Sequence, residues 1–191
     1  MKKAGSLVVL MFVAGVFAGL AHAQDAAKAA KPPKPAAGAS QVVLESWNDI
    51  GRKLIAMAED FPDDKLDFKP APTSQSFAER ILHAAGVNYF FTNLTLEQKP
   101  PSEEAPKRDQ FKTKADLAAY VKKSFADGAA AIKAKGDKGM NDLVVDPFEN
   151  QRVRISDFAY GFIEHSGEIY GQLTVYYRVA GMVPPESRPK K

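Results

Sequence analysis

The sequence predicts an all-α fold, a four-helix bundle with a long crossover between its third and fourth helices. Two observations support it. Apolar residues recur every three or four positions in four stretches of about 20 residues each, and polar, proline-rich segments separate these stretches. Apolar residues spaced in this way form a stripe along a helix that neighbouring helices must cover. The predicted helices run over 41–60, 76–94, 113–136 and 156–180.

Residues suited to capping precede three of these helices. Ser40 is the expected N-cap of the first helix. Ser76, with Glu79 three residues later, is typical of a capping box at the start of the second. Thr113 and Asp116 place a hydroxyl and an acid at the start of the third.

Glycine and proline are expected to end the helices. Phe61-Pro62 stops the first, Gly136 ends the third, and Gly181 ends the fourth ahead of two further prolines. The connection over 137–154 is long enough to cross the bundle, and its run 142–145 favours a short strand.

The N-terminal segment has the three parts of a secretory signal peptide. Lys2 and Lys3 are positively charged, residues 7–20 form an uncharged apolar run, and 21–23 (Ala-His-Ala) provide small residues for cleavage. The apolar run is shorter than the roughly 20 residues of a membrane-spanning helix, which favours cleavage over anchoring. Residues 1–23 are therefore predicted to be removed. A secreted or periplasmic protein without a membrane span is expected.

A linker is expected to separate the signal peptide from the helical domain. Residues 24–39 consist largely of Ala, Lys, Pro and Gly and have no apolar period, so this segment is predicted to be disordered. The folded domain is then expected over 40–187. Such a linker could tether an interaction module of the cell envelope.

The composition excludes several kinds of chemistry. The chain contains no cysteine, which excludes disulfides, thiolate metal ligands and a cysteine nucleophile. The formal net charge of +3 falls to about +1 when the two lysines of the signal peptide leave. Acidic and basic residues are mixed along the domain, so a nucleic-acid partner is not expected.

Two histidines are the main candidates for chemistry. Of the three histidines in the chain, His22 leaves with the signal peptide, and His83 and His165 lie on the apolar stripes of the second and fourth helices. Both should point into the bundle. Inward histidines on different helices are how bundles build metal sites, but a hydrogen-bonded core histidine is an equally open interpretation.

The sequence resembles the DinB-like (DinB/YfiT) superfamily. The runs 66–70 (LDFKP) and 76–86 (SFAERILHAAG) look like the start of the family's second helix, and 165–173 (HSGEIYGQL) with 177–185 (YRVAGMVPP) like its last helix and exit. The resemblance covers about 42–187 and implies a four-helix bundle. It also implies a divalent metal, often zinc or nickel. The family holds this metal with one histidine on the second helix and an H-x-x-x-H pair on the last.

The resemblance can be carried over for only two of the three ligands. His83 and His165 match the first two positions, but the third position is Ile169, which cannot bind a metal. Two imidazoles hold a metal less tightly than the three protein ligands usual in catalytic zinc sites. Glu168, three residues after His165, could complete a site of two histidines and one carboxylate. The interpretation we favour is that it faces solvent, as most glutamates do.

Three functions are compatible with this sequence. The first is an exported bundle with an incomplete metal site that binds a small molecule or a partner. The second is a metal-dependent hydrolase or transferase with His83, His165 and Glu168 as ligands. The third is the cell-envelope interaction module. The partner expected is an unidentified small molecule. Homodimerisation, which is common among bundles, stays open.

Overall fold

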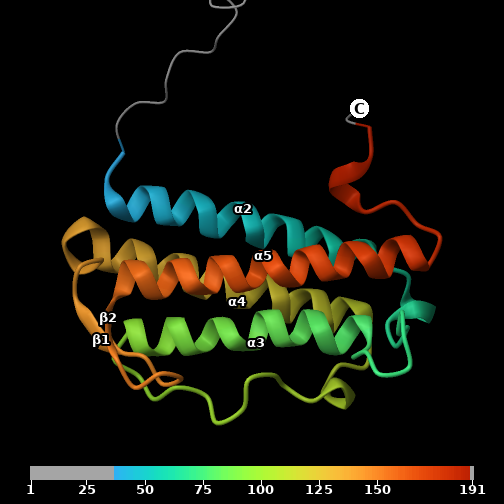
Figure 1. Cartoon of the computed structure of the whole chain (residues 1–191), viewed down its shortest axis with the longest axis horizontal. Coiled ribbons are helices and arrows are strands. Elements are labelled where there is room, and N and C mark those ends of the chain that lie inside the picture. Colours follow the sequence, from blue (N-terminus) through green and yellow to red (C-terminus); the bar gives the residue numbers. More distant parts are fainter. Residues whose placement is uncertain (1–36, 190–191) are drawn as a thin grey trace, which may run out of the picture. The chain divides into compact units, whose positions relative to one another are not determined.

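The computed structural model describes residues 37–189, which form a bundle of four α-helices (Figure 1). These are α2 (Ala39–Asp60), α3 (Phe77–Thr95), α4 (Lys114–Gly139) and α5 (Ile155–Val179). The predicted signal peptide and nearly all of the predicted linker lie outside the described residues. Within the part described, no helix has both the length and the hydrophobicity of a membrane span.

Two pairs of consecutive helices, α2 with α3 and α4 with α5, lie diagonally across the bundle, whereas α3 and α4 are neighbours. The main helix contacts are α2 with α4, α3 with α4, α2 with α5, and α3 with α5. The connections from α2 to α3 and from α4 to α5 therefore both cross the bundle. The predicted crossover between the third and fourth helices is one of them, and the predicted four-helix fold is confirmed.

The capping boxes that the sequence predicts are present. Ser76 Oγ accepts from Glu79 N at 3.2 Å, and the Glu79 carboxylate accepts from Ser76 N at 2.7 Å. Thr113 and Asp116 make the reciprocal pair at the start of α4, with both distances 3.1 Å. Ser40, in contrast, is not an N-cap. Gly38 has that position, and the Ser40 hydroxyl donates to Asp137 Oδ1 at 2.6 Å.

The connection between α4 and α5 forms a β-hairpin. Strand β1 (Leu143–Val145), which the sequence predicted, pairs antiparallel with β2 (Arg152–Arg154), which it did not. Gly136 has a φ of 57° and interrupts α4, which continues to Gly139 instead of ending there as predicted. The hairpin lies at one end of the bundle, beside α3 and α5 (Figure 1).

Aromatic side chains fill much of the core. Trp47 of α2 is fully buried, and its indole N–H donates to the Phe125 carbonyl at 2.9 Å. Phe61 and Phe77 stack with ring centres 3.8 Å apart. Tyr177 of α5 donates to the Met57 carbonyl at 3.2 Å. These contacts join all four helices into one core, against which the site between α3 and α5 is positioned.

Candidate functional site

His83 on α3 and His165 on α5 meet between the two helices. Their Nε2 atoms are 3.2 Å apart, and the ring planes are inclined by 78°. Both side chains are only partly accessible, at 17% for His83 and 36% for His165. The two histidines that the sequence singled out, 82 positions apart, therefore form a direct pair.

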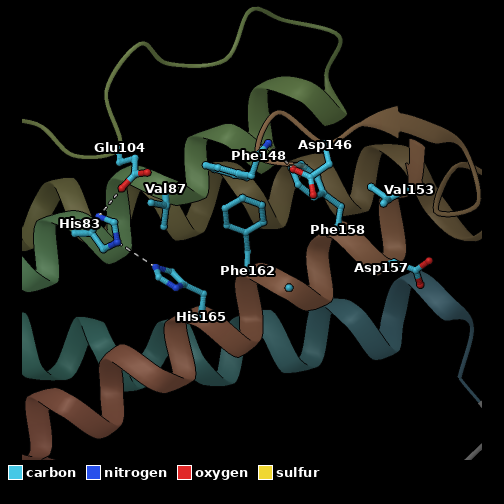
Figure 2. A pocket seen from close by; sticks show the side chains of 11 residues that line it. His83, Val87, Glu104, Asp146, Phe148, Val153, Asp157, Phe158, Phe162 and His165 are labelled. Carbon is cyan, nitrogen blue, oxygen red and sulfur yellow. Dashed lines mark hydrogen bonds and ion pairs between the residues drawn. The ribbon is translucent and has the colours of Figure 1, made fainter. Parts of the chain in front are cut away.

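A carboxylate lies behind each imidazole ring. Glu104, in the loop between α3 and α4, has Oε2 at 3.7 Å from His83 Nδ1 (Figure 2). Glu168, one turn after His165 on α5, has Oε2 at 3.9 Å from His165 Nδ1. Each Nδ1 atom thus faces an acid while the two Nε2 atoms face each other. An acid at Nδ1 orients a ring and favours a proton on that nitrogen.

Both histidines are held in the neutral form. Burial is the main cause that lowers the pKa of each imidazole below the ordinary value of 6.5, and the positive charge of Arg80 lowers both further. The nearby glutamates oppose this shift only in part. Two neutral rings form a hydrogen bond through Nε2 only when one Nε2 donates and the other accepts, so the bond requires that one of the two rings carries its proton on Nε2 and not on the Nδ1 that faces its glutamate.

A cavity of about 410 Å³ opens next to the pair (Figure 2). Its walls are mainly apolar: Val87, Phe148, Val153, Phe158 and Phe162. Polar side chains also line it: His83, Glu104, Asp146, Asp157 and His165. The histidines lie at one end and Asp146 towards the other, with Phe162 between them. Helices α3 and α5, the loop before α4 and the β-hairpin all contribute.

Comparison with known proteins identifies the family. The model of the DinB superfamily matches residues 46–173, more than half of the chain. This chain belongs to the DinB superfamily. No curated protein matches it. The match confirms the family that the sequence runs around His83 and His165 indicated.

Two solved structures share the fold of this DinB superfamily protein. A DinB-like protein from Bacillus cereus ATCC 10987 aligns with a TM-score of 0.64 at 21% identity, covering 75% of this chain and 93% of that one. YfiT from Bacillus subtilis aligns with a TM-score of 0.61 at 15% identity, covering 80% and 94%. YfiT is described as a probable metal-dependent hydrolase with an unusual four-helix bundle topology. At these identities, the likeness shows the fold alone.

Glu168, the third predicted ligand, does not face the Nε2 atoms at which His83 and His165 meet. Glu168 approaches Nδ1 of His165, whereas His83 faces Nε2 of the same ring. Ile169, at the family's third position, is 1% exposed and belongs to the core. No group of three histidine or acidic side chains arranged for a metal occurs within residues 37–189. Glu168 as a direct ligand stays a prediction.

Sequence reasoning missed several residues of the site. Glu104 and Asp146 lie in connections whose positions follow from tertiary packing. Gly86 is a third: a Cβ atom there would lie 2.2 Å from the carbonyl oxygen of Glu104. Its missing side chain lets the loop approach α3 and bring Glu104 to His83. A glycine three residues after His83 was the one local signal that a backbone passes close by.

The histidine pair should make stability depend on pH. Because burial lowers the pKa of His83 and His165 in the folded state, the unfolded chain binds more protons once the pH falls below about 6.5. We expect these two histidines to leave the free energy of unfolding unchanged above about pH 7 and to decrease it as the pH falls through about 6.5 towards their lowered pKa values. Urea unfolding with a chelator present measures it. The double variant His83→Gln, His165→Gln should show a flatter profile, and an equal slope in both proteins would contradict the prediction.

Proposed function

We propose that this protein binds a small organic molecule in the cavity beside His83 and His165. The observation behind the proposal is the cavity itself, about 410 Å³ in volume and bounded at one end by two neutral imidazoles. Ligand sites commonly have volumes of about 300–1,000 Å³, mostly apolar walls and a few convergent polar groups. The phenyl rings would hold the apolar body of the ligand.

The two imidazoles would recognise a polar group of that ligand. A neutral ring offers one donor and one acceptor, so the pair can open its mutual hydrogen bond and give one of each to the ligand. Glu104, behind His83, favours the tautomer with a proton on Nδ1. His83 then presents a free Nε2 lone pair towards the cavity, which can accept a hydrogen bond or a proton.

A bulky residue in the cavity wall tests this proposal. Gly161 lines the cavity, and an added Cβ atom there meets nothing within 4 Å. Gly161→Leu should fill part of the cavity and weaken binding of phenylbutanol, a neutral probe, by about tenfold or more, as measured by calorimetry. Gly171 is on the same helix and equally open, but it does not line the cavity. Gly171→Leu should bind as the native protein does, and equal binding by both variants would refute the proposal.

A metal-dependent hydrolase is the second candidate, and the geometry of the pair favours it. Two nitrogen ligands of a tetrahedral zinc are about 3.3 Å apart, given bonds of 2.0–2.1 Å. The Nε2 atoms of His83 and His165 are 3.2 Å apart, so these residues fit a divalent cation such as zinc or nickel. Glu104 and Glu168 would orient the two rings from Nδ1. When bound, such a cation would supply an activated water or polarise a carbonyl.

Metal content separates the two candidates. Two imidazoles alone should hold zinc weakly, so we expect the purified protein to lose zinc on dialysis against a mild chelator and to gain it back when zinc is added. The regained zinc should raise the thermal unfolding temperature of the native protein but not of His83→Gln. An equal rise in both proteins would place the zinc elsewhere and remove this candidate.

We also propose that the protein is exported and acts outside the cytoplasm. The support is the charged start, apolar run and Ala-His-Ala sequence within residues 1–23. Residues 24–39 would then link the domain to its surroundings. N-terminal sequencing of the protein from its native cells should find Gln24 first, and an intact Met1 would contradict export with cleavage.

A further inference from the structure

We infer that the ligand of this cavity is an organic cation, an amine with an apolar body, whose ammonium group binds Asp146 at the end of the cavity away from the histidines. The inference rests on the proposed function, because it names the class of molecule that the same cavity takes. Three observations lead to it: the sign of the charges in the lining, the environment of Asp146, and the aromatic walls.

Every charged side chain that lines the cavity is acidic. Glu104, Asp146 and Asp157 line it, and within residues 37–189 the lining includes no lysine or arginine. The charge of Asp157 is matched by Arg154, whose guanidinium donates to it at 2.8 and 3.1 Å. Glu104 faces His83. Asp146 lies towards the other end of the cavity, and no cationic side chain among residues 37–189 pairs with it.

Asp146 is fixed in position and half-buried. Its Oδ1 accepts from the backbone N–H of Phe148 at 2.8 Å, and its own N–H donates to the Gln151 carbonyl at 2.8 Å. No ion pair within the described part of the chain includes Asp146, and its second oxygen accepts no hydrogen bond there. A half-buried acid next to apolar side chains is stabilised by a cation that enters with the ligand.

Aromatic rings surround the path between Asp146 and the histidines. Phe158 and Phe162 lie edge to face, with ring centres 4.9 Å apart. Phe148 packs on Phe90 at 5.2 Å, yet 54% of Phe148 remains exposed. Ring faces attract cations as well as apolar groups, so these walls suit an amine that has an aromatic or aliphatic body. The same rings offer nothing that would stabilise an anion.

The two ends of the cavity therefore select different groups. The end at Asp146 takes the ammonium group, and the two imidazoles at the other end, whose ring nitrogens can donate or accept hydrogen bonds, take a polar group. The ligand is expected to be elongated, with an apolar section between these groups that lies against Phe162 (Figure 2).

A series of three probes of the same shape tests the inference. Phenylbutylamine, phenylbutanol and phenylbutyrate differ in charge at pH 7 but have nearly the same apolar body. We expect the amine to bind the native protein about tenfold more tightly than the alcohol, and the anion to bind most weakly. Calorimetry at low salt measures all three dissociation constants.

Asp146→Asn is the decisive variant, because it removes the charge and keeps the oxygen that accepts from Phe148 N. It should weaken amine binding about fivefold to tenfold and leave phenylbutanol binding unchanged. Glu149 is the matched control: it is an exposed acid on the same hairpin that does not line the cavity. Glu149→Gln should keep the affinity for the amine within about twofold of the native value.

The outcomes separate this inference from the proposed function. Equal affinity for all three probes, or tightest binding of phenylbutyrate, overturns the cation while cavity binding stands. The same loss of amine affinity in Asp146→Asn and Glu149→Gln also overturns it, since that shows a general surface field. Absence of binding by every probe refutes the proposed use of the cavity, and the inference falls with it.

Discussion

Replacing Ile169 with histidine is expected to turn the pair of histidines into a tight site for zinc or nickel. Ile169 lies four residues after His165 on α5, which places the two side chains on the same side of the helix. It also occupies the position where the family has its third histidine. Removing a side chain that only orients a metal ligand already costs about 10–100-fold in metal affinity. Adding a side chain that binds the metal directly should therefore strengthen zinc binding by about 100-fold or more.

The same substitution should lower stability when no metal is present. Ile169 is 1% exposed in the core, and an imidazole there loses apolar packing and buries polar nitrogens. We expect a lower thermal unfolding temperature for Ile169→His in chelator and a higher one than native in excess zinc. Competition with a coloured chelator measures the affinity.

Ile163→His provides the control for Ile169→His. Ile163 is a partly buried isoleucine of α5 that packs against the core and does not line the cavity. The control should bind zinc no more tightly than the native protein. Equal zinc affinity of both variants would show that position 169 does not direct a side chain towards His83 and His165.

Local signals in the sequence were sufficient for most of the fold. The capping boxes at Ser76 and Thr113 involve partners three residues away, so the starts of α3 and α4 could be predicted. Ser40 was misassigned because its partner, Asp137, is 97 residues away. Strand β2 was missed for a similar reason: three residues form a strand only because β1 pairs with them.

The candidate site also contains some residues that the sequence reveals and others that it does not. His83 and His165 could be found because helical periodicity places both on inward stripes. Glu104 and Asp146 could not, since each lies in a connection whose path is set by contacts distant in sequence. The approach of the Glu104 loop depends on Gly86, and the position of Asp146 on the turn of the hairpin. The charges of the cavity, and with them the class of ligand, are therefore a result of tertiary structure.

Trp47→Ala should cause the largest loss of stability among the substitutions considered. The side chain is fully buried, packs on Phe91 and Phe125 at 5.0 and 5.7 Å, and donates to a buried carbonyl. A Cβ atom on Gly128 would lie 2.1 Å from the indole, so the core is fitted closely around it. Removing the indole leaves a large cavity and deletes a buried hydrogen bond. We expect the free energy of unfolding to fall by about 3–5 kcal/mol in urea titrations.

The substitution Trp47→Ala should also weaken ligand binding in the cavity. Phe91, on which Trp47 packs, lies 6.2 Å from Phe158 and 6.1 Å from Phe162, and these two rings form the cavity wall. With the indole gone, Phe91 can relax away from both rings, so Trp47→Ala should bind phenylbutanol more weakly even under conditions where it is folded.

Val42→Ala, at a side chain of α2 that is 53% exposed, is the control and should change stability by less than about 0.5 kcal/mol. If Trp47→Ala loses stability but binds phenylbutanol with native affinity, the cavity wall is independent of the core beneath it. Its shape would then be held by α3, α5 and the hairpin alone.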